Sequence, residues 1–298
     1  MKCVVTIFFA SLLGIPAYHS FAQEAPGTGP ISVWPDLAPG ETERTTGTQL
    51  PMRAVDNPPI VRVEKIRRPP MSVYPATKKA NGSAVLILPG GGFGKVVPNL
   101  EGSEAADWLC DLGVTCFVLN YRTRLPNNTK EPAWKRPLQD AQRAMRWIRA
   151  NANRWNLDRE KIGLLAFSAG GQVGAILITQ EEASYEPIDQ IDEQAFRPDF
   201  AMLIYPWNMY EKKTDNLMSV IQVNQNTPPS FIVHTHDDGS TSLGSVLLYA
   251  DMKRQQIPAE LHIYETGGHG YGTRARPNSN IGSWTDRATD WLERRLPR

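Results

Sequence analysis

The feature that most constrains the fold is a series of short apolar runs that alternate with longer amphipathic segments. The runs expected to form strands are 84–88, 114–119, 161–167, 200–205, 230–235 and 260–264. The segments expected to form helices are 100–112, 137–152, 169–179, 243–255 and 284–295. Such runs are typical of strands buried on both faces. Their alternation with helices predicts the α/β class, with a mainly parallel central sheet and helices on both faces.

The remaining segments divide the chain into three parts. Residues 23–59 are rich in Pro, Gly and Thr and predict an extended N-terminal arm. Residues 60–298 are expected to form one domain, which is within the usual size of an α/β domain. At its start, 60–66 and 71–74 alternate and are β-branched, so we expect them to pair as antiparallel strands joined by Pro69-Pro70.

Residues 1–22 have the pattern of a cleaved export signal. Lys2 precedes an apolar run from Cys3 to Ile15, and small residues flank Phe21 at the expected cleavage site before Gln23. The alternative is an uncleaved anchor, but the run is shorter than the roughly 20 residues that a spanning helix needs. We therefore expect a secreted or periplasmic protein. In that compartment Cys110 and Cys116 could be bridged, although two buried thiols are the preferred interpretation.

The charge balance narrows the possible partners. The chain carries 32 basic and 31 acidic residues, so its net charge is +1. This gives no reason to expect nucleic acid or an anionic membrane as a partner. A neutral or weakly charged substrate is the better expectation, and the sequence does not predict the oligomeric state.

The most specific motif is Ala166-Phe167-Ser168-Ala169-Gly170-Gly171, which lies between a predicted strand and a predicted helix. Small residues on both sides of Ser168 allow the sharp turn that exposes a nucleophilic hydroxyl. The amide of Ala169, at the helix N-terminus, can then stabilise a developing negative charge. The competing interpretation is a serine that only caps the helix, but the strand–serine–helix context favours Ser168 as a nucleophile.

A glycine run follows the first buried strand, at Pro89-Gly90-Gly91-Gly92-Phe93. Consecutive glycines expose backbone amides without side chains that block a substrate oxygen. A phosphate-binding loop is the alternative, but the Lys-Ser/Thr pair that such a loop requires is missing. We therefore predict that Gly91 and Gly92 form an oxyanion hole together with Ala169.

The general base is predicted to be His269, because Gly267-Gly268-His269-Gly270 is a flexible turn just after a strand. The acid that orients it should follow the preceding strand, where Asp237 and Asp238 stand side by side. Either could serve. We favour Asp237 as the acid and expect Asp238 to cap the next helix.

The same segment permits a different chemistry. His234, His236 and Asp238 resemble the beginning of a metal-ligand motif, although Gly239 replaces the next histidine. Few other histidines remain to complete a site of three or four ligands. A metal-dependent hydrolase is therefore kept only as an alternative, and no metal or cofactor is expected.

Taken together, these motifs resemble bacterial secreted esterases of the acetylxylan esterase and feruloyl esterase type, within the α/β-hydrolase superfamily. The resemblance extends from Val33-Trp34-Pro35 to the C-terminus and includes Asn120-Tyr121-Arg122 and Asp140-Ala141-Gln142-Arg143-Ala144. It implies an α/β-hydrolase catalytic domain, a serine mechanism without a cofactor, and an ester-decorated carbohydrate as the substrate. The order Ser, Asp, His is that of the superfamily.

The sequence also departs from the family pattern. Ala166 replaces the usual first glycine of the serine turn, and Gln172 stands where histidine is frequent. Residues 239–242 replace the usual apolar stretch after the aspartates, which weakens the choice between them.

Other functions remain open from the sequence. A serine peptidase of the prolyl-oligopeptidase type shares the residue order, although 59 N-terminal residues cannot form the large gating domain of such enzymes. A carbohydrate-binding descendant without activity is disfavoured because every catalytic position is filled. Residues 206–228, which include Trp207, could form a cap over the acyl pocket or could simply be packed against the core.

Overall fold

The computed structural model describes residues 30–125 and 130–296. The predicted signal peptide, residues 1–22, lies outside this part of the chain. A central sheet has the strand order β1-β4-β7-β5-β8-β9-β12-β13. Its strands are β1 (Ile31–Ser32), β4 (Pro70–Tyr74), β5 (Ala84–Leu88), β7 (Thr115–Leu119), β8 (Ile162–Phe167), β9 (Ala201–Ile204), β12 (Ser230–Thr235) and β13 (Ala259–Tyr264).

The six strands from β7 to β13 run parallel, whereas β4 is antiparallel to β7 and β1 is antiparallel to β4. The expected α/β class with a mainly parallel sheet is thus confirmed. In parallel strands all carboxyl ends meet at one edge of the sheet. The loops after β5, β8, β12 and β13, which carry the predicted site residues, therefore leave the sheet at the same edge.

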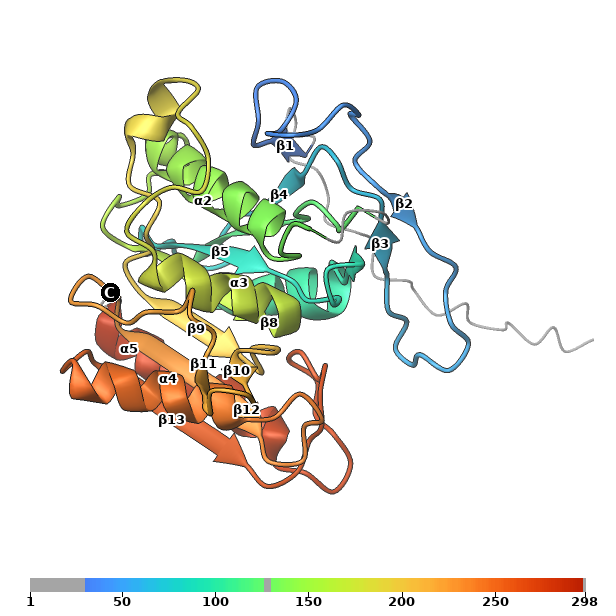
Figure 1. Cartoon of the computed structure of the whole chain (residues 1–298), viewed down its shortest axis with the longest axis vertical. Helices are drawn as coiled ribbons and strands as arrows, with labels where there is room; N and C mark the ends of the chain where they lie inside the picture. Colours follow the sequence, from blue (N-terminus) through green and yellow to red (C-terminus); the bar gives the residue numbers. More distant parts are fainter. Residues whose placement is uncertain (1–29, 126–129, 297–298) are drawn as a thin grey trace, which may run out of the picture.

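Helices cover both faces of the sheet (Figure 1). The helices are α1 (Glu104–Asp111), α2 (Lys135–Ala150), α3 (Ser168–Thr179), α4 (Leu243–Arg254) and α5 (Trp284–Arg295). The apolar residues of α2, α3 and α4 belong to one core cluster, and those of α1 and α5 belong to another. Side chains of β5 alternate between the two clusters, with Leu86 in the first and Val85 in the second. This alternation explains why the central strands are apolar throughout.

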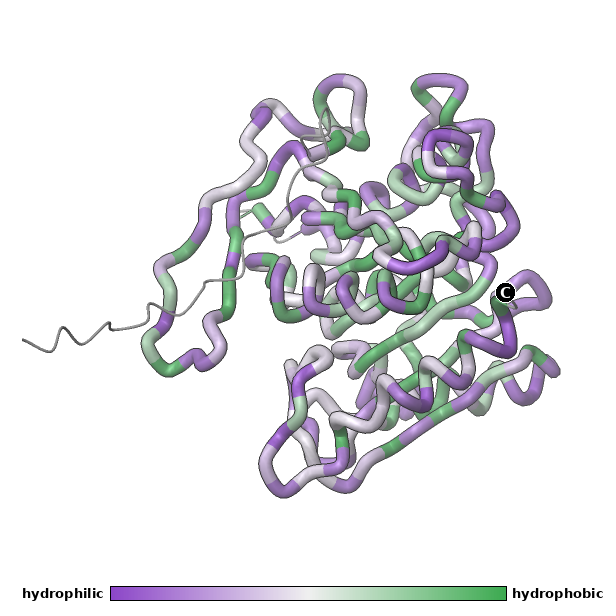
Figure 2. The backbone as a smooth tube through the Cα atoms, turned by 180° about the vertical axis from the view of Figure 1, so that it is seen from behind, coloured by the Kyte–Doolittle hydropathy of each residue, from purple (hydrophilic) through white to green (hydrophobic). Residues whose placement is uncertain are grey.

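The apolar character of the central strands is visible along the backbone in Figure 2, where peripheral loops are mostly hydrophilic. Within residues 30–125 and 130–296, no helix combines the length and the apolar character needed to cross a bilayer. Cys110 and Cys116 are both buried and present as free thiols.

The expected pairing of 60–66 with 71–74 is wrong. The first segment forms β3 (Val63–Glu64), which pairs with β2 (Thr48–Gln49) and β6 (Lys95–Val96) in a separate three-stranded sheet. The second forms β4 in the central sheet. The intervening residues turn the chain away instead of folding it back, because the backbone of Arg67 and Arg68 bonds to Thr45 of the preceding segment.

Part of the N-terminal arm is anchored in the core. Trp34 is fully buried and its indole Nε1 donates to Asp140 Oδ1 over 2.7 Å. The same carboxylate accepts from the side chain of Arg122 over 2.9 Å and from its backbone amide over 2.8 Å. These buried contacts join the arm, the loop after β7 and α2. The motifs around Arg122 and Asp140 therefore stabilise the fold beside the predicted site.

Candidate active site

Ser168 stands at the sharp turn between β8 and α3. Its φ of 51° lies in the left-handed region, which is unusual for a residue other than glycine. A Cβ atom on Gly170 would come within 2.3 Å of the Leu88 carbonyl oxygen, so the turn requires a glycine at this position. The strained turn is therefore held by close packing against the end of β5. It presents the Ser168 side chain, whose residue is 7% exposed, above the sheet.

Three side chains form a continuous hydrogen-bonded chain at this edge. The Ser168 Oγ atom lies 2.7 Å from Nε2 of His269. On the other side of the ring, Nδ1 of His269 lies 2.6 Å from Oδ2 of Asp238. The two ring nitrogens are thus engaged by a hydroxyl and a carboxylate. This arrangement allows the ring to take the serine proton while the carboxylate stabilises the resulting imidazolium.

The structure contradicts Asp237 as the acid of this chain. Its exposed carboxylate instead accepts from the amides of Gly267, over 3.1 Å, and Gly268, over 2.8 Å. These two bonds lower the pKa of Asp237 and fix the turn that leads to His269. Adjacent residues after β12 point in different directions, and it is the buried Asp238 that faces the imidazole.

Asp238 also contacts His234, which the sequence placed inside a strand without a role in the serine mechanism. His234 is fully buried, and its Nε2 lies 3.1 Å from the Asp238 Oδ2 atom that also faces His269. Its Nδ1 lies 2.9 Å from Oγ of Ser245 on α4. Burial opposes ionisation of Asp238, but the bonds from both histidines outweigh it and hold its pKa well below the ordinary value.

The residues of the metal alternative do not converge. His236 is exposed, whereas His234 and Asp238 are buried and bonded to each other. Throughout the described ranges, no group of three or more His, Cys, Asp or Glu side chains is arranged to hold a metal ion. The geometry of His234 and Asp238 instead extends the serine-linked chain.

The glycine loop after β5 lies against Ser168. A Cβ atom on Gly90 would come within 2.6 Å of Ser168 Cβ, so this loop packs directly beside the serine. The Gly90 amide donates to Glu101 Oε2 over 2.7 Å and is not free for a substrate. In the described part of the chain, the amides of Gly91 and Gly92 have no protein acceptor. Ala169 is in the first turn of α3, where amides lack helical acceptors.

Residues 206–228 pack on the core and contact the Ser168 turn. Their hairpin, β10 (Tyr210–Glu211) and β11 (Asn216–Leu217), packs through Met209 and Leu217 on the main core. At the start of the segment, the amide of Trp207 donates to the Ser168 carbonyl, and its ring lies 6.0 Å from the ring of Phe93. These contacts link the start of the segment to the Ser168 turn and to Phe93 at the end of the glycine run.

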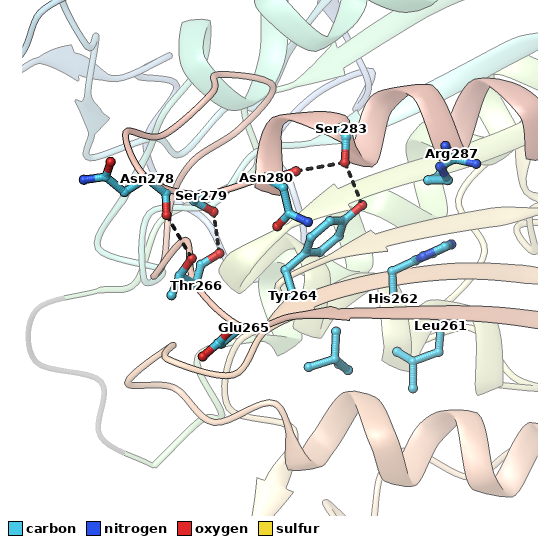
Figure 3. Close-up of a pocket in the computed structure, with 11 residues that line it drawn as sticks. Leu261, His262, Tyr264, Glu265, Thr266, Asn278, Ser279, Asn280, Ser283 and Arg287 are labelled. Atoms are coloured by element: carbon cyan, nitrogen blue, oxygen red, sulfur yellow. Dashed lines mark hydrogen bonds between the residues drawn. The ribbon is translucent and has the colours of Figure 1, made fainter.

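A separate polar cavity of about 890 Å³ opens beside the edge strand β13 and does not include the Ser168 chain. Figure 3 shows its side chains, with the Tyr264 hydroxyl directed toward Ser283. Thr266, at its end, precedes the Gly267–Gly268 turn, so the cavity and His269 share one loop.

Comparisons with known proteins identify relatives of this chain. The family model BD-FAE matches residues 71–200. An acetylxylan esterase of Xylanibacter ruminicola is 28% identical over 64% of this chain and 42% of its own length. An endo-1,4-beta-xylanase B of Butyrivibrio fibrisolvens is 28% identical over 68% of this chain and 34% of its own. The chain thus spans less than half the length of these two curated relatives.

Among solved structures, an acetyl ester-xyloside bifunctional hydrolase from Caldicellulosiruptor lactoaceticus is 30% identical, with a TM-score of 0.65. The match covers 76% of this chain and 88% of that one. The fold and these relatives together define a protein of the α/β-hydrolase class. More specifically, the chain belongs to the acetylxylan esterase-like α/β-hydrolases.

Proposed function

We propose that this chain is an exported serine esterase that removes acetyl groups from hemicellulose-derived polysaccharides or oligosaccharides through an acyl-enzyme. The observation that carries the serine mechanism is the hydrogen-bonded chain from Ser168 through His269 to Asp238. The carbohydrate substrate is supported by the names of the similar proteins, two of which are an acetylxylan esterase and an acetyl ester-xyloside hydrolase.

In the proposed reaction, His269 Nε2 takes the proton of Ser168 while Oγ attacks the ester carbonyl carbon. The amides of Gly91, Gly92 and Ala169 hold the oxygen that becomes negative. Asp238 stabilises the imidazolium, which then protonates the sugar oxygen as the ester C–O bond breaks, so that the sugar leaves with a free hydroxyl. A water molecule, deprotonated by the same imidazole, attacks the acyl-enzyme and releases the acid.

The surroundings of Ser168 favour a small acyl group. The residue is 7% exposed, and the glycine loop and the Phe93–Trp207 pair lie beside it. An acetyl group needs little space beyond the carbonyl carbon, whereas a feruloyl group needs a slot for an aromatic ring. Acetyl is therefore the proposed acyl group, and feruloyl is the alternative that the substrate comparison must test.

The experiment is acetate release from acetylated xylan and acetylated xylo-oligosaccharides, beside feruloylated oligosaccharides, by the parent and by Ser168→Ala. We expect acetate release by the parent alone, at a higher kcat/KM than ferulate release. Faster release of ferulate than of acetate would show that feruloyl, and not acetyl, is the preferred acyl group. Release by Ser168→Ala at the parent's rate would overturn the serine mechanism itself.

Export is proposed from the N-terminal sequence alone. Lys2 and the apolar run that follows it support recognition by an export system. N-terminal sequencing of the protein recovered from the periplasm or the medium should begin at Gln23. Recovery of the intact chain from the cytoplasm only would contradict the proposal.

A further inference from the structure

Glu101 is a buried acid beside the active site that the mechanism above does not use. It lies in the short π-helix η1 (Asn99–Ser103) and is 3% exposed, which places its carboxylate out of reach of bulk water. None of the ion pairs in the described ranges includes it. A buried carboxylate without a cationic partner is costly unless it accepts good hydrogen bonds.

The first bond that Glu101 accepts comes from the glycine loop. Its Oε2 atom lies 2.7 Å from the Gly90 amide nitrogen. Gly90 itself lies between the carboxylate and Ser168, because a Cβ atom built on it would be 2.7 Å from Oε2 and 2.6 Å from Ser168 Cβ. The bond therefore fixes the peptide that leads directly into Gly91 and Gly92.

The second bond comes from Tyr205, at the end of β9. The hydroxyl of this fully buried tyrosine donates to Glu101 Oε1 over 2.8 Å and accepts from the Gly272 amide over 2.9 Å. Its ring meets the imidazole of His269 edge-on, with the ring centroids 4.9 Å apart. Tyr205 thus supports the histidine loop at two points, through the ring of His269 and through the backbone of Gly272.

Within the described residues, Glu101 therefore links the two halves of the site, directly on the glycine side and through Tyr205 on the histidine side. One oxygen holds the glycine loop on the oxyanion side, and the other holds the tyrosine against which the base rests. We propose that Glu101 is a positioning residue that fixes the distance between the oxyanion amides and the imidazole of His269. The proposal rests on the serine mechanism proposed above.

The test uses Glu101→Gln and Tyr205→Phe. The glutamine keeps an oxygen for Gly90, but its amide group meets the tyrosine oxygen with a donor instead of an acceptor. Tyr205→Phe removes the hydroxyl and leaves the Gly90 bond intact. Tyr185→Phe is the matched control, because Tyr185 also donates its buried hydroxyl to a carboxylate, that of Asp192, within a network that does not include the catalytic chain.

We expect each of the two site variants to lower kcat on 4-nitrophenyl acetate by about 10- to 100-fold, with KM changed by about twofold or less. Inhibition by ethylboronic acid, which forms a tetrahedral adduct on a catalytic serine, should weaken by a similar factor. Because both variants break the same Glu101–Tyr205 bond, the double variant should lose less than the product of the single losses. Tyr185→Phe should leave kcat and boronate inhibition unchanged.

Unchanged kcat and boronate affinity in folded Tyr205→Phe would overturn the proposal, and this outcome is decisive even when Glu101→Gln does not fold. Losses of the same size in Tyr185→Phe would also overturn it, since they would reflect general destabilisation. Ser168→Ala separates a failure of the serine mechanism from a failure of the role proposed for Glu101. Activity that survives Ser168→Ala refutes the serine mechanism, whereas an inactive Ser168→Ala with a fully active Tyr205→Phe refutes only the role of Glu101.

Discussion

The Nδ1 atom of His269 lies 2.6 Å from Oδ2 of Asp238, although 30 residues and the whole of α4 and β13 separate the two side chains in the sequence. The contact forms because β12 and β13 are parallel neighbours whose carboxyl ends meet at one edge. It makes Asp238, and not its neighbour Asp237, the carboxylate that can hold the imidazole in the orientation needed for proton transfer.

The first prediction separates these two aspartates. Asp238→Asn should lower kcat by about 10³- to 10⁴-fold, because an amide can hold the wrong tautomer of His269 and cannot stabilise its positive charge. Asp237→Asn keeps one acceptor for the Gly267–Gly268 turn and should cost less than about tenfold. Steady-state kinetics on 4-nitrophenyl acetate measure both. A larger loss in Asp237→Asn than in Asp238→Asn would contradict the assignment.

The second prediction concerns His234. Its Nε2 lies 3.1 Å from Asp238 Oδ2 and its Nδ1 lies 2.9 Å from the Ser245 hydroxyl, so both ring nitrogens have a polar partner. His234→Phe keeps an aromatic ring but removes the donor, and should lower kcat by about tenfold or more. Ser245→Ala keeps the Asp238 bond and should have a smaller effect. A kcat equal to that of the parent in both variants would show that His234 does not support Asp238.

The third prediction concerns the core beneath the arm. Asp140→Asn removes the charge that faces fully buried Arg122 and should lower the free energy of unfolding by about 3–5 kcal/mol. Asp251→Asn is the matched control, because its ion pair with Arg254 is on the surface and should contribute less than about 1 kcal/mol. Urea unfolding compares them. Equal stability of the two variants would contradict the structural role given to Asp140.

The fourth prediction concerns pH and Glu101. Burial raises the pKa of this carboxyl above its ordinary value of 4.5, in spite of the bonds from Tyr205 and Gly90. The folded state therefore binds the proton more tightly than the unfolded state. The stability that tighter proton binding by Glu101 contributes is complete below pH 4.5, and it is lost as the pH rises through the pKa that this carboxyl has in the folded state.

Glu101→Gln does not titrate, so its stability relative to the parent should increase as the pH is raised from below 4.5 to neutrality. Thermal unfolding of both proteins across this range measures the difference, and the other titrating groups, which both proteins share, cancel to first order. A parent that gains stability relative to Glu101→Gln as the pH rises would contradict the burial argument.

Much of the fold could be predicted because local patterns determine it. The apolar run 230–235 and the amphipathic segment 284–295 coincide with β12 and α5, since strands buried on both faces and helices with one apolar face have distinct periodicities. The pairing of 60–66 with 71–74 could not be predicted reliably. Two alternating segments near each other in sequence suggest a hairpin, but β3 pairs with β2 and β6, and β4 pairs with β1 and β7.

In the site, too, local sequence patterns predicted some residues, whereas others depend on tertiary contacts. Ser168 and His269 stand in glycine-rich turns next to strands, and the structure brings them within hydrogen-bond distance. The choice between Asp237 and Asp238 depends on which carboxylate faces inward after β12, and the unusual stretch 239–242 gave no guidance. Glu101 and Tyr205 belong to no motif used in the sequence analysis. Their roles arise from contacts between η1, β9 and the histidine loop, which only the tertiary structure reveals.

The central claim, that Ser168 is the nucleophile of an acyl-enzyme mechanism, is tested most directly by covalent trapping. The protein is treated with diethyl 4-nitrophenyl phosphate, residual esterase activity is followed, and the labelled peptide is located by mass spectrometry. We expect complete inactivation with one diethylphosphoryl group on Ser168, and no label at that peptide in Ser168→Ala. Full activity after saturating treatment, or inactivation with the label on another residue and Ser168 unmodified, would contradict it.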